Sequence, residues 1–150
     1  MNIHEHDKGG KKGGKLKILL DQSERVLLKD ALFRYMNTYA LTSPVLENNE
    51  PLSRDVDAFK LASRLHPSLL KTSSTSGEVG VVIHERHAMS LIQIAQYNER
   101  CTLPDLAQTK NPERCDQIRA IGNFCIELTD QVLEHFDNQN LNQLVPTINE

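Results

Sequence analysis

The longest regular pattern of apolar positions lies in the last third of the chain. Small or apolar residues recur there at spacings of three and four, at Cys115, Ile118, Gly122, Cys125, Thr129, Val132 and Phe136. This spacing indicates one buried face of an α-helix. Asn111 is a favourable N-cap, and Pro112 fits the first helical position, where its missing N–H costs nothing. The pattern predicts a helix over residues 112–137.

Two shorter helices are predicted nearer the N-terminus. Asp21 and Glu24 have the spacing of a capping box, which predicts a helix over 22–40. Its apolar face consists of Leu28, Ala31, Leu32, Tyr35, Met36 and Tyr39. After a turn-like connection at 41–53, Ser53 can cap a second helix over 54–66, which Pro67 is expected to end. The apolar face of that helix consists of Val56, Phe59, Ala62 and Leu65.

Residues 79–83 fit two structures. The β-branched run from Val79 to Ile83 is typical of a strand. The run continues without turn residues into apolar positions at helical spacing, namely Ala88, Leu91, Ile92 and Ala95. We favour one helix over 79–98 and keep a strand at 79–83 as the alternative. A Ser- and Thr-rich linker at 72–77 precedes it, and a loop is expected at 99–110.

These patterns predict an all-α fold, a single-domain bundle of four main helices with one or two extra short turns over 21–138. A chain of 150 residues fits one domain, and its core must be aliphatic because Trp is absent. Residues 1–20 are predicted to form a flexible basic arm rich in Gly and Lys, and 139–150 a loose end.

The predicted helix faces define a core and one close helix contact. We expect six residues to be buried: Leu32, Phe59, Leu91, Ile118, Cys125 and Val132. Gly in the interior of a helix costs about 1 kcal/mol relative to Ala. Gly122 lies on the apolar face, which predicts that another helix crosses there closely.

Charge is distributed unevenly along the chain. Residues 1–20 carry five lysines against Glu5 and Asp7, a net charge of +3, so the remainder carries −6 of the total of −3. An acidic body is a poor surface for nucleic acid, whereas a mobile basic arm can reach an anionic partner. The tentative partner-binding residues are Lys11, Lys12, Lys15 and Lys17.

A phosphate-binding loop is not supported, although Gly9 to Lys15 has the spacing of its first part. The next residue is Leu16 rather than the Ser or Thr that binds magnesium, and no apolar strand precedes the glycines. We interpret the segment as a flexible linker.

No metal or cofactor is predicted. His84 and His87 lie three residues apart instead of the four of a metalloprotease helix, and no third ligand is adjacent. His84 shares the spacing of neighbouring apolar residues and is expected to be interior or at the boundary. His4 and His6 lie in the arm, where a defined metal site is not expected.

Two further groups of residues have a structural interpretation that is favoured over catalysis. The acidic row Glu127, Asp130 and Glu134 faces away from the apolar stripe, which indicates a solvated face. The three cysteines are interpreted as small apolar residues, although Cys115 in a first helical turn could have a lowered pKa.

These observations favour a small non-catalytic helical protein that binds a protein partner as an adaptor, regulator or inhibitor. Extra apolar positions on the last helix suggest self-association, including a homodimer. The alternative is association with nucleic acid through the basic arm. A metal or thiol enzyme is the third interpretation. The chain lacks a signal-like or membrane-spanning segment, which favours the cytoplasm.

Overall fold

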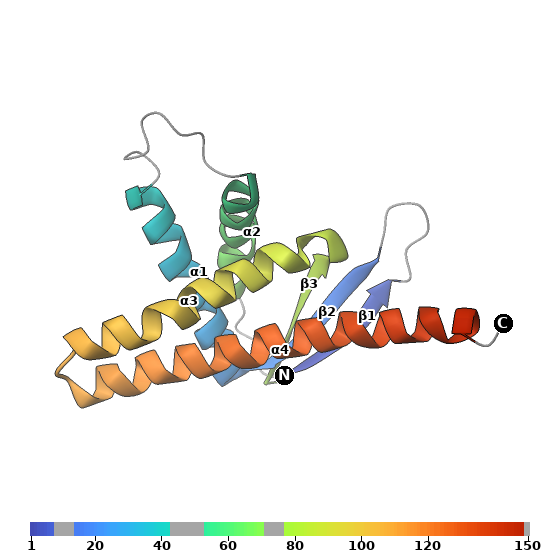
Figure 1. Cartoon of the computed structure of the whole chain (residues 1–150). Helices are drawn as coiled ribbons and strands as arrows, with labels where there is room; N and C mark the ends of the chain where they lie inside the picture. The colour runs from blue at the N-terminus through green and yellow to red at the C-terminus, as the bar shows by residue number, and fades with distance from the viewer. Residues whose placement is uncertain (8–13, 43–52, 71–76, 149–150) are drawn as a thin grey trace.

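The structure combines long helices with a small sheet (Figure 1). The computed structural model describes the backbone of residues 1–7, 14–42, 53–70 and 77–148, and the side chains of 1–5, 14–39, 55–70 and 77–137. The elements are β1 (Asn2–Asp7), β2 (Lys15–Asp21), α1 (Gln22–Thr42), α2 (Ser53–Leu70), β3 (Glu78–His84), the 3-10 turn η2 (Glu85–His87), α3 (Ala88–Gln108) and α4 (Pro112–Ile148). The described part is therefore mostly helical with four long helices, as predicted, but it is not all-α.

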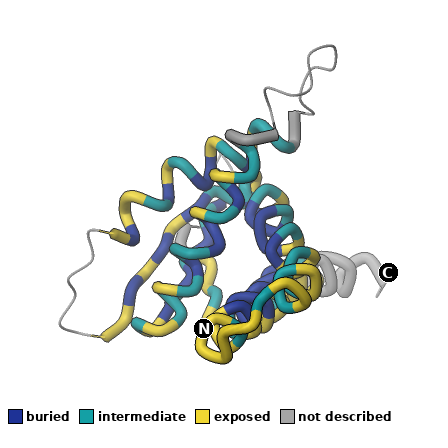
Figure 2. Tube along the Cα trace, turned by 90° about the vertical axis from the view of Figure 1, so that its left-hand side faces the viewer, coloured by how far each residue is buried: buried dark blue, intermediate teal, exposed yellow. Residues whose placement is uncertain are grey.

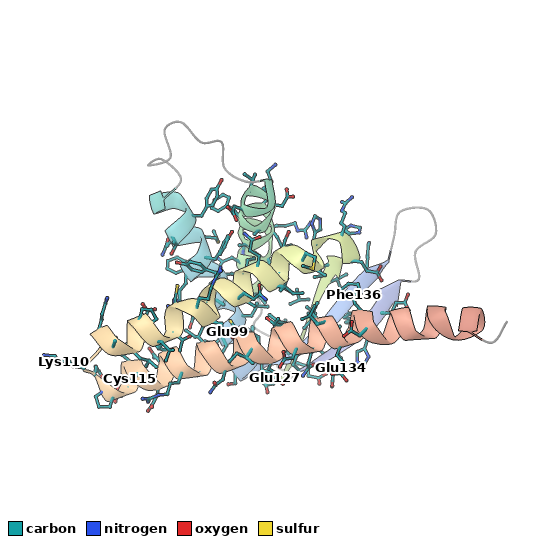
Figure 3. All side chains as sticks on the ribbon, in the orientation of Figure 1. Glu99, Lys110, Cys115, Glu127, Glu134 and Phe136 are labelled. Atoms are coloured by element: carbon teal, nitrogen blue, oxygen red, sulfur yellow. The ribbon has the colours of Figure 1, made fainter. Side chains whose placement is uncertain are left out.

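The four helices form two pairs. α3 and α4 lie side by side and are joined by a short turn at Lys110, whereas α1 packs against α2 (Figures 1 and 3). Arg25 on α1 donates from Nη1 to the carbonyl oxygen of Leu69 on α2 at 2.7 Å, and Tyr39 stacks on Phe59 with ring centroids 4.5 Å apart. α1 also contacts α3 and α4, and thus connects the two pairs. Among the described helices, none combines the length and apolar character needed to cross a membrane.

The sheet is antiparallel, with β2 between β1 and β3. Every second residue of β2 points toward the helices, so Leu16, Ile18 and Leu20 are fully buried. Their neighbours on β3 are Ile83, Val81 and Val79, which are buried on the same face. α1 and α4 contact the sheet, and Figure 2 shows the buried positions concentrated where helices and sheet meet.

The prediction of a flexible arm over 1–20 is wrong for the segments that form β1 and β2. The alternation of Leu16, Ile18 and Leu20 with polar or half-buried neighbours has the period of a strand, and Ile3 packs against the resulting core. Deleting residues 1–15 would remove a strand, so it should lower the thermal midpoint.

The prediction of one helix over 79–98 is also wrong. Val79, Val81 and Ile83 are buried while Gly80 and Val82 are exposed, so the segment is a strand, the alternative left open above. Helical structure starts at η2, and α3 begins at Ala88. The β-branched run was therefore the stronger local signal.

Three helices extend beyond their predicted ends. α2 continues through Pro67 to Leu70, and α3 continues through Pro104 to Gln108, where a loop over 99–110 was expected. Packing outweighs the missing N–H of Pro67, because Leu69 is buried and its carbonyl oxygen accepts from Arg25. The backbone of α4 is helical to Ile148, so a loose end over 139–150 is wrong for most of that range. The connection at 43–52 and the linker residues 71–76 lie outside the described residues.

Two of the three predicted N-terminal caps are confirmed, and the side chain of the third, Ser53, lies outside the described residues. The backbone N–H of Glu24 donates to Asp21 Oδ1 at 2.7 Å, and the N–H of Asp21 donates to Glu24 Oε1 at 3.0 Å, which is a reciprocal capping box. Asn111 Oδ1 accepts from the N–H of Glu113 at 2.9 Å. These bonds satisfy donors that the first turn of a helix leaves unpaired.

The core largely agrees with the predicted helix faces. Five of the six predicted core residues are buried, and Phe59 is partly buried against the same cluster. The close helix contact at Gly122 is confirmed, because an ideal Cβ there would lie 2.5 Å from Thr102 Oγ1 on α3. Asn98 is fully buried between α1 and α3, and its Nδ2 donates to the carbonyl oxygen of Ala31 at 3.0 Å.

Candidate functional site

Two of the four predicted partner-binding lysines lie on the central strand. Lys15 is opposite His84 and Lys17 is opposite Val82, both on β3. Their side chains are half-buried on the face of the sheet that points away from the helices. Lys11 and Lys12 lie outside the described residues. The structure therefore places Lys15 and Lys17 on an ordered surface instead of a flexible arm.

The outward face of the sheet accommodates the stem of Lys17. A Cβ built on Gly80 would lie 2.8 Å from Lys17 Cε, so the missing side chain at Gly80 leaves room for the lysine stem across the neighbouring strand. The stem covers backbone while the ammonium group remains near solvent, a common arrangement for Lys. On β1, His4 is opposite Lys17 and is exposed, which adds a third polar side chain to this row.

A group of cationic and titratable side chains lies where β3 runs into α3. It consists of Lys15 on β2, Arg64 on α2, His84 on β3, and Arg86 and His87 on η2, and we call it the basic end. The rings of His84 and His87 have centroids 6.0 Å apart. Arg86 donates from Nε to His87 Nε2 at 3.4 Å. α2 contacts η2, which brings Arg64 to the group.

Electrostatic effects on the two histidines show how close these charges lie. Burial lowers the pKa of His84, and Arg86, Lys15 and Arg64 lower it further. Burial also lowers the pKa of His87, as do Arg64, Arg86 and His84, whereas Asp57 raises it. Nearby positive charge disfavours the imidazolium form, so both rings are held toward the neutral state. Burial is the larger cause of the lowered pKa of both rings, and the nearby cations act in the same direction.

The elements around the basic end also carry acidic residues, among them Asp57 on α2, Glu85 on η2, and Asp7 on β1, which is opposite Lys15. Among the described residues, Lys15, Arg64 and Arg86 have no carboxylate within ion-pair distance. Asp57 and Glu85 are the carboxylates that lie closest along the chain to Arg64 and Arg86. The described chain breaks off after Asp7 and resumes at Gly14, and both residues lie at this end of the sheet. The Gly14 carbonyl oxygen accepts from the N–H of Glu85 at 3.0 Å, which ties Gly14 to η2.

Metal and nucleotide motifs find no support at this site. The part of the chain whose residues are described contains no cluster of three or more His, Cys, Asp or Glu side chains arranged to hold a metal. His84 is partly buried, as expected, and its Nδ1 is shielded from water without a partner in the described structure. The residues after the glycine-rich segment form strand β2 and not the helix that a phosphate-binding loop requires.

The cysteines and the acidic row lie away from the basic end. Burial raises the pKa of Cys125 to about 12, so it is an inert thiol in the core, whereas Cys101 and Cys115 are partly exposed and unbridged. Glu127 and Glu134 are exposed along α4, as predicted for a solvated face (Figure 3).

Charge along the sequence indicated only part of this site. Lys15 was found because it belongs to a lysine-rich segment, and His84 and His87 were noticed for their spacing. Arg64 was missed because it lies twenty residues before His84 and on a different element, α2. The packing of α2 against η2 brings it near, and no local pattern in the sequence signals that contact.

Comparisons with known proteins assign no function to the chain, so only the geometry described above indicates one. No protein-family model, no curated protein and no solved structure matches the chain.

Proposed function

We propose that this protein is a non-catalytic nucleic-acid-binding protein that contacts phosphates through its basic end. The observation that supports the proposal most is the convergence of Lys15, Arg64 and Arg86 from separate elements, without carboxylate partners among the described residues. Cationic side chains gathered on one surface of an otherwise acidic chain attract phosphate strongly. Binding to nucleic acid was the alternative function inferred from the sequence, and these cations make it the function that we favour.

The chemistry of the surface favours contacts to the backbone over contacts to bases. The described outward positions of the sheet carry no Phe, Tyr or Trp side chain on which a base could stack, and they do not form a helix that would enter a major groove. Arg and Lys bind phosphates without regard to sequence. We therefore infer a modest affinity that depends steeply on salt and weakly on base sequence.

A charge-matched pair of variants tests this proposal. Arg64→Gln/Arg86→Gln removes two cations from the basic end, whereas Lys110→Gln/Arg114→Gln removes two exposed cations from the turn between α3 and α4, at the far end of α3 (Figure 3). Fluorescence anisotropy with a labelled DNA duplex at about 50 mM salt measures the affinity. The first variant should bind about tenfold or more weakly, and the second should resemble the wild type. Equal losses in both variants would show that only net charge matters, and absence of wild-type binding would refute the proposal.

A second function, self-association, is favoured by one exposed apolar surface. Val26 and Phe33 on α1 and Leu70 on α2 are 37%, 50% and 58% exposed, and we call them the apolar patch. The ring of Phe33 stacks on His66, one turn before Leu70, with centroids 5.7 Å apart. Exposed apolar side chains gathered on one face often mark protein contacts, and a two-fold dimer brings a patch onto itself.

The oligomeric state as a function of concentration tests self-association. Phe33→Ser/Leu70→Ser alters the apolar patch, and Met89→Ser/Leu103→Ser alters two apolar residues of α3 that are even more exposed, 66% and 78%, as a control. Light scattering coupled to size exclusion should show dimers for wild type and control, and monomers for the patch variant. A wild-type protein that remains monomeric at high concentration would exclude this second function.

A further inference from the structure

The cations of the basic end come from three separate elements that meet around His84 and His87. Lys15 comes from the central strand, Arg64 from α2 and Arg86 from η2, with His84 and His87 between them. A row of cations suits a chain of singly charged phosphodiesters. A convergent group suits one compact anion that carries more than one charge, because several donors can reach its oxygens together.

Arg86 can donate hydrogen bonds to a bound anion from its two terminal nitrogens. Its Nε donates to His87 Nε2, so the bond holds the guanidinium beside the ring and leaves Nη1 and Nη2 for another acceptor. The two terminal nitrogens of Arg match two oxygens of a phosphate. Arg64 on α2 is exposed and can approach the same anion from another direction.

We propose that the basic end binds a terminal phosphate monoester of a nucleic acid in preference to an internal phosphodiester. This inference rests on the proposed function and specifies which phosphate the site selects. A monoester carries nearly two negative charges at pH 7 and offers three oxygens, whereas a diester carries one charge and offers two. Convergent donors distinguish the two groups by charge and by the number of bonds.

Short DNA duplexes that differ only at their ends test the preference. We would compare binding of one duplex with 5′-phosphate, 3′-phosphate or only hydroxyl ends, by anisotropy at fixed salt. Binding to a phosphorylated end should be about tenfold tighter, the change expected from one added hydrogen bond to a charged group. The two phosphorylated forms show which end supplies the monoester.

Two variants test whether the preference for a phosphorylated end arises at the basic end. Arg64→Gln/Arg86→Gln should bind all duplexes equally weakly, while Lys17→Gln, outside the basic end, should weaken all of them by a similar factor and keep the preference. Thermal midpoints near that of the wild type confirm that the variants are folded. Equal wild-type affinity for all ends overturns the inference and leaves the proposed function intact. A preference that survives Arg64→Gln/Arg86→Gln also overturns it, and no binding to any duplex overturns both proposals.

Discussion

The close contact between α3 and α4 at Gly122 predicts a defined energetic coupling with Thr102. An ideal Cβ at position 122 would lie 2.5 Å from Thr102 Oγ1 and 3.0 Å from Thr102 Cγ2. The Thr102 hydroxyl donates to the carbonyl oxygen of Asn98 at 3.0 Å, which anchors its rotamer. Gly122→Ala therefore forces Thr102 to give up that hydrogen bond or pushes the helices apart.

Two opposing contributions determine how much Gly122→Ala should change the free energy of unfolding. Replacing Gly by Ala within a helix stabilises by about 1 kcal/mol. Overpacking a tight contact costs about 1–3 kcal/mol. Gly122→Ala should thus leave the free energy of unfolding unchanged or lower it by up to about 2 kcal/mol. Gly122→Leu, with a larger side chain, should destabilise further.

A double-mutant cycle separates these terms. In a Thr102→Ala background the closest contacts disappear, and the remaining Thr102 Cβ position lies 3.3 Å from the new Cβ. Gly122→Ala should then stabilise the protein by up to about 1 kcal/mol. Denaturant unfolding of the four proteins measures the coupling, which we expect to be about 1–3 kcal/mol. A coupling below about 0.5 kcal/mol would refute the close helix contact.

Three further predictions concern the core, the thiols and the histidines. Leu91→Ala should lower the free energy of unfolding by about 2–5 kcal/mol because Leu91 is buried, whereas Met89→Ala should change it little because Met89 is 66% exposed. A thiol reagent should label the two other cysteines of the native protein, and Cys125 only after unfolding, which mass spectrometry can verify. His84 and His87 have lowered pKa values, so the unfolded chain takes up protons before the folded protein does as the pH falls below 6.5. The free energy of unfolding should therefore fall with pH in that range. Thermal unfolding measured across the range should show a weaker pH dependence for His84→Gln/His87→Gln.

The sequence indicated the helices better than the sheet, for a physical reason. The spacing of Leu28 and Leu32, or of Cys125 and Val132, repeats over several turns and is hard to mistake. β2 has only three inward residues, which are separated by Lys17 and Leu19 and preceded by Lys15 and glycines. The lysines therefore made the period of two hard to recognise. The run from Val79 to Ile83 lies next to a helical pattern, and only the pairing with β2 distinguishes a strand from a helix.

The candidate site was predictable only where its residues are close in sequence. Lys15 stood out within a lysine-rich segment, but its neighbours at the basic end come from α2, β3 and η2. Arg64 occupies what looked like the solvated face of a predicted helix. Its role depends on a tertiary contact, which periodicity and composition do not encode.

Mapping the bound surface by NMR tests nucleic-acid binding at the basic end most directly. Titration of isotope-labelled protein with a short DNA duplex should shift the backbone amides of Lys15, Arg64, Arg86 and their neighbours. The amides around Lys110 and along the acidic face of α4 should stay nearly unchanged, and about 0.2 M salt should reverse most of the shifts. Shifts concentrated on α4 or on the apolar patch, or no shifts at low salt, would contradict the account.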